Sequence, residues 1–265
     1  MKDSVKEYGA NASIYNNLAC LYATIDKKDK AYEYFMKAIT LKEESGVYDK
    51  VLSNYYHNIA KLYEKDNNYD KAIFYYLKKV NVLEDISLSD KILVCYDNLI
   101  DLYKKNNDYD SVIKYYYKKI DILKNDIDYE NILEIVNIYQ EIIDIYRLND
   151  KSDMIVNCYT EIISLLRSGC LNEEESKFIL AHIYMMMGNY YKSIGNNKSA
   201  KKYFLKNIDI REEFRKKNYL FNNNLLMISY MNLLSLYYYD NDMDRAMLIR
   251  NKLNTLMNTN RVCLK

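Results

Sequence analysis

A pair of tyrosines spaced seven residues apart recurs six times, and this recurrence constrains the fold more than any other feature of the sequence. Seven residues are nearly two turns of an α-helix, so both rings of a pair lie on one helix face. Successive pairs begin about 40 to 46 residues apart, which spreads the pattern over nearly the whole chain. The sequence therefore predicts a stack of helical modules. The pairs are Tyr15/Tyr22, Tyr56/Tyr63, Tyr96/Tyr103, Tyr139/Tyr146, Tyr184/Tyr191 and Tyr230/Tyr237.

Residues suited to a chain reversal and a second helix follow each pair at fixed offsets. Gly, Asn and Asp tolerate the left-handed conformation that ends a helix, and one of them stands four residues after each second tyrosine: Asp26, Asn67, Asn107, Asp150, Gly195 and Asn241. A small or aliphatic residue, which allows close approach of the helices, stands nine residues after each second tyrosine: Ala31, Ala72, Val112, Ile155, Ala200 and Ala246. An aromatic residue usually follows four positions later: Phe35, Tyr76, Tyr116, Tyr159 and Phe204. Each module is thus predicted to be two antiparallel helices.

The composition agrees with a helical chain that has a substantial core. There is no proline and there are only five glycines among 265 residues, while 49% of the residues are hydrophobic. We expect most of the tyrosines to form that core. The tyrosine runs 115–117 and 237–239 cannot all point inward, so their outermost members should lie at an exposed edge.

The pattern resembles the tetratricopeptide repeat (TPR) family. The first module shows the family series in full, with Tyr15, Leu18, Ala19, Tyr22, Ala31, Phe35 and Ala38 in the expected positions. The period exceeds the commonest one of roughly 34 residues, and the closing proline of the family is absent. The longer period is more similar to the kinesin-light-chain and peptide-sensing branch of the family.

The resemblance implies an all-α fold, a right-handed superhelical solenoid of about six TPR-like antiparallel helix pairs. We expect residues 1–265 to form a single such domain. The predicted repeat units are 12–45, 53–86, 93–126, 136–169, 181–216 and 227–258. Little sequence follows the last unit to cap the stack, so self-association through uncapped ends or continuation into a longer array is a further expectation.

In relatives of this type, the first helix of each repeat lines a concave groove. The position two residues before the buried small residue is Asn17, Asn58, Asn98, Glu141, Met186 and Asn232 in the six repeats. An Asn side chain offers both a hydrogen-bond donor and an acceptor, and the resemblance implies that Asn17, Asn58 and Asn98 hold the backbone of a bound peptide. The alternative is that they are ordinary solvated or capping amides.

Other positions on the same helix face complete the candidate peptide-binding groove. They carry Lys61, Asp101 and Asp144, each of which could instead belong to a solvated helix face. The candidate site also includes Met186 and Asn232, nearer the C-terminus. In this part of the chain most positions on the face are apolar. The apolar positions are Met185, Met186, Ile228, Met231, Tyr238 and Tyr239, which the chain itself or a second subunit could also cover.

Several classes of function are disfavoured. The net charge of +1 gives no electrostatic reason to expect nucleic acid. No apolar run is long enough for membrane insertion. Only two histidines occur, His57 and His182, and no phosphate-binding glycine motif is present, so we expect no catalysis, no metal and no cofactor. The five scattered cysteines indicate neither a disulfide framework nor a zinc site, which favours a cytoplasmic location.

The sequence therefore predicts a non-catalytic protein–protein interaction scaffold that binds a peptide or an extended partner segment in its concave groove. Two alternatives remain open. The chain could be the sensor part of a peptide-responsive regulator. It could also be an adaptor, similar to the soluble NSF attachment proteins, that docks a folded partner by its convex face or its ends.

Overall fold

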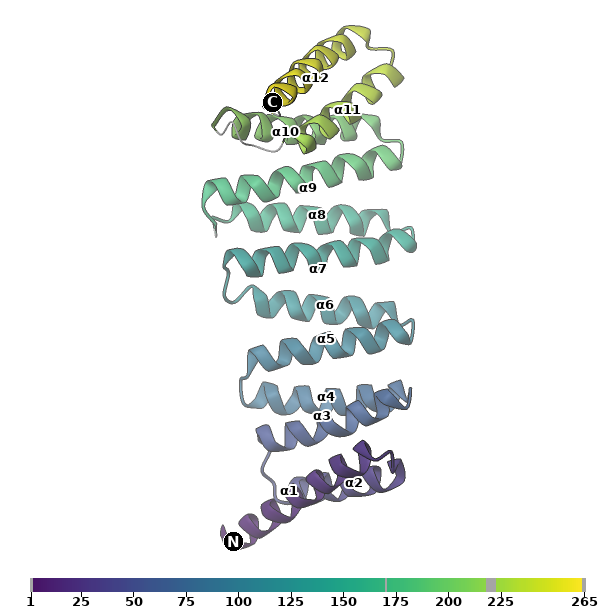
Figure 1. The fold of residues 1–265 in the computed structure, drawn as a ribbon, viewed down its shortest axis with the longest axis vertical. Helices are drawn as coiled ribbons and strands as arrows, with labels where there is room; N and C mark the ends of the chain where they lie inside the picture. The colour runs from purple at the N-terminus through teal and green to yellow at the C-terminus, as the bar shows by residue number, and fades with distance from the viewer. Residues whose placement is uncertain (1, 170, 218–222, 264–265) are drawn as a thin grey trace. The chain divides into compact units, whose positions relative to one another are not determined.

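The computed structural model describes residues 2–169, 171–217 and 223–263, with side chains described between residues 11 and 258 of these ranges. The described residues form twelve α-helices and no strand, which confirms the all-α prediction (Figure 1). The helices are α1 (Lys2–Thr24), α2 (Lys28–Glu44), α3 (Lys50–Lys65), α4 (Tyr69–Asp85), α5 (Ser89–Lys105), α6 (Tyr109–Leu123), α7 (Tyr129–Leu148), α8 (Ser152–Arg167), α9 (Glu173–Ser193), α10 (Asn197–Lys217), α11 (Asn224–Tyr239) and α12 (Met243–Cys263).

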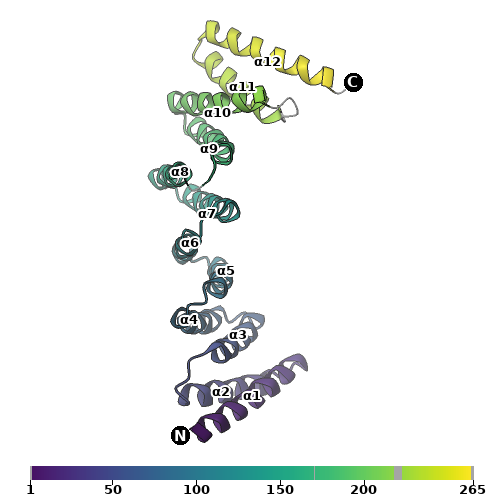
Figure 2. The same cartoon turned by 90° about the vertical axis from the view of Figure 1, so that its left-hand side faces the viewer.

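The helices fall into two compact units, an N-terminal half (Met1–Asp126) with α1 to α6 and a C-terminal half (Ile127–Lys265) with α7 to α12. Consecutive helices pack in pairs, α1 with α2 through α11 with α12, and these pairs are repeats 1 to 6. Within the N-terminal half, the first helices α3 and α5 lie on one side and the second helices α4 and α6 on the other (Figure 2). A single domain over residues 1–265 stays a prediction.

The turn inside each repeat is a left-handed helix stop, as predicted. The six turn residues Asp26, Asn67, Asn107, Asp150, Gly195 and Asn241 all have positive φ, between 54° and 74°. The amide of the following residue bonds to the carbonyl of the second tyrosine, for example Asn68 N to Tyr63 O at 2.9 Å. This six-to-one bond is the mark of a Schellman motif. The turn residue lies four positions after the second tyrosine, and this distance allows the next residue to form the hydrogen bond of the motif.

The predicted tyrosine stripe is part of the core. The first tyrosine is buried in repeats 2 to 6, and the second is buried or half-buried in every repeat. The small residues of the second helices are fully or almost fully buried, and Phe35, Tyr76, Tyr116, Tyr159 and Phe204 lie beside them in the interior. Tyr115 and Tyr116 are buried and Tyr117 is half-buried, while Tyr238 and Tyr239 are exposed, so the expected edge positions are confirmed.

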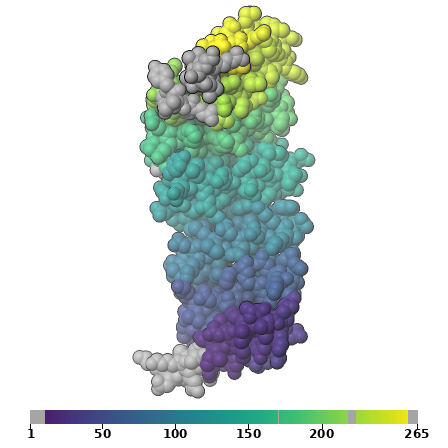
Figure 3. Space-filling view, viewed as in Figure 1, coloured from purple at the N-terminus to yellow at the C-terminus, as the bar shows by residue number. Residues whose placement is uncertain are grey.

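A second tyrosine contact recurs that the sequence pattern alone did not reveal. In four repeats the residue twelve positions after the second tyrosine is also a tyrosine, and the two rings stack. The stacked pairs are Tyr22/Tyr34, Tyr63/Tyr75, Tyr103/Tyr115 and Tyr191/Tyr203, with ring planes within 16° of parallel. These stacks join the two helices of one repeat, and side chains fill the space between neighbouring helices of each half (Figure 3).

Candidate functional site

Part-buried polar contacts join several first helices to the second helix of the preceding repeat within the same half. Tyr56 of α3 donates a hydrogen bond to the Glu43 carboxylate of α2 at 2.5 Å, and Lys78 of α4 donates to the same oxygen at 2.8 Å. Burial alone would raise the pKa of Glu43, but the bonds from Lys78 and Tyr56 outweigh it and leave the pKa lowered. The equivalent residues in the C-terminal half are Tyr230, Glu212 and Lys252.

A cavity of about 270 Å³ opens between α1 and α3 in the N-terminal half. Two predicted site residues, Asn58 and Lys61, line it. Buried Phe35 and Leu62 form its apolar part. The other lining residues are Cys20, Ala23, His57 and Lys65. Sequence reasoning missed Cys20, although it lies three residues after Asn17 and therefore on the same face of its helix.

Asn58 is half-buried and already engaged on one side. Its amide donates to Asn16 Oδ1 at 3.0 Å and more weakly to Cys20 Sγ at 3.7 Å, both on the preceding first helix. These bonds orient the amide group of Asn58, which lines the cavity. The NH2 group of Asn58 is thus already used within the chain, and only its side-chain oxygen is available to a ligand. The sequence had suggested that both groups would contact the ligand.

His57 and the two lysines give the cavity its polar character. Burial, and then the charges of Lys79 and Lys61, lower the pKa of His57 to about 4, so the imidazole is neutral near pH 7. Its Nδ1 atom is buried and has no hydrogen-bond partner among the described residues. Lys61 pairs with Glu64 at 2.9 Å and Lys65 pairs with Asp26 at 3.6 Å. Both lysines are exposed and lie at the rim of the cavity.

The other predicted site residues of the N-terminal half have different surroundings. Asn17 is exposed, and its side chain makes no hydrogen bond within the described part of the chain. Asn98 is half-buried and bonded on both sides, since its amide donates to Val94 O at 2.7 Å and its oxygen accepts from Tyr76 at 3.4 Å. Asp101 is exposed. The three asparagines are therefore not equivalent, although they occupy equivalent positions.

The predicted residues of the C-terminal half do not share one environment either. Asp144 is exposed on α7 and accepts from Gln140 at 3.0 Å and Arg147 at 2.8 Å. Asn232 of α11 accepts from Lys192 of α9 at 3.0 Å. Met186 is half-buried on α9. The expected apolar character of this face is present, because Met231 is 57% exposed and Ile228 44% exposed on α11.

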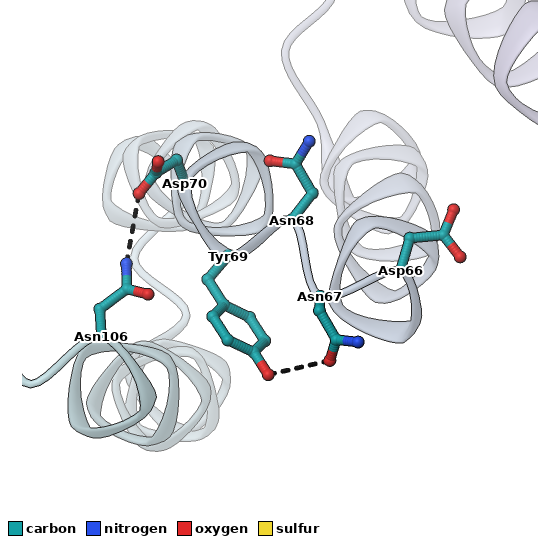
Figure 4. A pocket seen from close by; sticks show the side chains of 6 residues that line it. All are labelled: Asp66, Asn67, Asn68, Tyr69, Asp70 and Asn106. Carbon is teal, nitrogen blue, oxygen red and sulfur yellow. Dashed lines mark hydrogen bonds between the residues drawn. The ribbon is translucent and has the colours of Figure 1, made fainter.

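A second hollow, of about 320 Å³, lies at the turn between α3 and α4 (Figure 4). Tyr69 donates to Asn67 at 2.9 Å and Asn106 to Asp70 at 3.2 Å, while Asp66 points away from them and accepts from Lys28 at 2.6 Å. Asn68 caps α4 through its side chain. These polar groups therefore pair with one another or with neighbouring repeats, which stabilises the turn.

Several site types are missing from the described part of the chain. No group of three or more His, Cys, Asp or Glu side chains there could hold a metal ion. No helix in the described ranges is long and apolar enough to cross a membrane. The described cysteines Cys20, Cys95 and Cys158 are not part of a disulfide, whereas the side chains of Cys170 and Cys263 lie outside the described residues. Burial raises the pKa of Cys20, which lowers its reactivity.

Comparison with known proteins identifies the repeat type. The tetratricopeptide repeat model matches residues 12–45, 53–80 and 181–214, which fall in repeats 1, 2 and 5, and no catalytic family is indicated. No curated protein matches the sequence.

Similar solved structures come from several organisms, and at these identities the likeness concerns the fold alone. A kinesin-light-chain-like protein with TPR-like repeats from Podosopora anserina is 13% identical, with 77% of this chain and 96% of that one covered and a TM-score of 0.42. The apo quorum sensor NprR from B. thuringiensis is 14% identical, with 96% and 75% covered and a TM-score of 0.43. A signal transduction ATPase with a tetratricopeptide repeat sensor from Pyrococcus horikoshii is 15% identical, with 97% and 37% covered and a TM-score of 0.45.

Proposed function

Because the chain contains tetratricopeptide repeats, we propose that it is a non-catalytic protein-binding scaffold whose first helices hold an extended peptide. The cavity between α1 and α3 carries the proposal. It combines an apolar interior, which suits one side chain of a ligand, with an oriented amide and two lysines at the rim. The polar contacts at Glu43 and Tyr56 keep the surrounding helices in place before any ligand arrives.

The peptide runs along the face of α1, α3 and α5 in this proposal. Asn17 and the free oxygen of Asn58 contact its backbone, and Lys61 and Asp101 contact its side chains. Asn98 contributes less, because both sides of its amide are occupied within the chain. In the C-terminal half, Asp144, Met186 and Asn232 remain proposed contacts of the same ligand class. The proposal includes a cytoplasmic location, which Cys20 and Cys95 support because neither is part of a disulfide.

Selection from a random peptide library followed by fluorescence anisotropy tests this function. Asn58→Ala combined with Lys61→Ala should weaken the selected peptides by about tenfold or more, since a contact of 1.4 kcal/mol is a factor of ten in Kd. Lys71→Ala combined with Asn81→Ala is the matched control, because both residues are exposed on the second helix α4. Failure to select any peptide, or equal weakening by both pairs, would contradict the proposal.

Docking of a folded partner is a second candidate, favoured by exposed apolar side chains on α11 and α12. Tyr239 is 77% exposed, and Met247 and Leu248 are also exposed. A partner that depends on these side chains should lose affinity with Tyr239→Ser and Met247→Ser and keep it with the Asn58 and Lys61 changes. The role of a sensor within a larger regulator would use the same groove.

A further inference from the structure

Four cationic side chains are buried in the described part of the chain: Lys42, Lys79, Lys119 and Arg211. Two of them have a carboxylate of the chain as partner, since Lys42 pairs with Asp49 at 2.9 Å and Lys119 pairs with Asp97 at 2.7 Å. A buried charge without a counter-charge costs several kcal/mol, so such pairing is the expected arrangement. Arg211 departs from it.

Arg211 lies on α10 and is 3% exposed. It forms no ion pair with any described residue, and its Nε atom is buried without a hydrogen-bond partner. Unlike a lysine, an arginine keeps its charge when it is buried. Burial lowers its pKa, but the side chain stays a cation. The folded protein therefore holds a desolvated guanidinium whose donors are not all used.

Neighbouring contacts place Arg211 where α9, α10 and α11 meet. Asn207, one turn earlier on α10, is fully buried; it donates to the carbonyl of Ala181 on α9 and accepts from Ser229 of α11 at 2.6 Å. This network joins α9, α10 and α11 one helical turn before Arg211. His182 follows Ala181 directly and is exposed on α9. The charge of Arg211 reaches it, because burial and then Arg211 lower the pKa of His182.

Lys79 gives an informative parallel in the N-terminal half. It occupies the position in repeat 2 that Lys119 occupies in repeat 3, and His57 stands where repeat 3 has Asp97. Both histidines of the chain thus lie within the electrostatic reach of a buried cation that has no acid partner among the described residues. Lys79 and His57 do not occupy the repeat positions of Arg211 and His182, so the two pairs are separate cases of a buried cation near a histidine.

We propose that Arg211 and His182 form a carboxylate-binding site, occupied by an acidic group of the peptide that the first helices hold. The planar guanidinium matches a carboxylate, and the partly exposed imidazole of His182 adds a second donor within reach of the Arg211 charge. The site itself stands on the burial and missing partner of Arg211. Only the source of the carboxylate, a side chain or the C-terminus of a peptide, rests on the proposed function.

The site is tested first with acetate alone, by following the His182 ring resonance in NMR spectra. Sodium acetate should shift this resonance saturably in the wild type, whereas sodium chloride at equal ionic strength should not. Arg211→Met should abolish the acetate response and raise the melting temperature in acetate-free buffer, because it removes an unpaired buried charge. Lys119→Met is the matched control and should leave the acetate response unchanged. No saturable shift in the wild type, or an unchanged shift in Arg211→Met, would overturn the site.

The second arm uses peptides selected on the full chain. Replacing each Glu or Asp of the peptide by its amide, and separately amidating its C-terminus, identifies the source of the carboxylate. One of these changes should weaken binding by about tenfold to the wild type and have no effect on binding to Arg211→Met. Equal loss with both proteins would overturn the peptide source. A positive acetate response without any groove peptide would keep the site and count against the proposed function alone.

Discussion

The first helices of the two halves present different chemistry on the same hairpin frame. In the N-terminal half, Asn58, Lys61 and His57 surround a cavity. In the C-terminal half, α9 and α11 present half-buried Met186 and exposed Ile228 and Met231. The left-handed turns are nevertheless the same in both halves, and the tyrosine pairs are part of the core in both. The helix hairpins therefore fix the positions of the side chains. Residues outside the buried core can differ between repeats and so provide different binding surfaces.

The largest effect should come from removing a core ring of the C-terminal half. Phe204 is fully buried and packs so closely on Gly188 that an added Cβ there would lie 2.6 Å from its ring. Phe204→Ala should cost about 3–5 kcal/mol. In hydrogen exchange, amides of α9 to α12 should lose protection while those of α1 to α5 keep it, because stability in a repeat stack is transmitted mainly between neighbours. Equal loss in both halves would show that they unfold as one unit.

A smaller difference should separate two tyrosine hydroxyls that contact the preceding repeat, one in each half. Tyr56→Phe removes a charge-assisted hydrogen bond to Glu43 and should cost about 1–2 kcal/mol in urea unfolding. Tyr184→Phe removes an acceptor for Arg167, whose side chain can turn to water instead, and should cost less than about 1 kcal/mol. The reverse order would mean that the Glu43 contact does not stabilise the stack.

The smallest expected effect is the pH dependence of stability that comes from His57 in the N-terminal cavity. The pKa of His57 is lowered to about 4 in the folded protein, against an unfolded value near 6.5. The unfolded chain therefore binds the proton first, so this stability is fully present above pH 6.5 and is lost between pH 6.5 and 4. His57→Gln should remove this part of the pH dependence, worth at most about 1 kcal/mol after solvent screening. An unchanged slope in thermal melts from pH 7 to 4.5 would contradict the assignment.

The sequence predicted the features that depend on local spacing. The left-handed turn at Asn67 follows from the chemistry of one residue type, and the burial of Tyr56 follows from helical periodicity. Contacts between repeats were not predictable, because they depend on how far one hairpin slides along the next. The bond from Asn58 to Asn16, the bond from Tyr56 to Glu43 and the missing partner of Arg211 belong to this class.

Amide and methyl NMR perturbation by a selected peptide tests the central claim most directly, since it locates the ligand on one side of the hairpins. The proposed groove predicts that the perturbed signals belong to α1, α3 and α5 and include Asn58, with little change on α2, α4 and α6. Perturbations concentrated on the second helices, or on the turn around Asn67 and Tyr69, would contradict it.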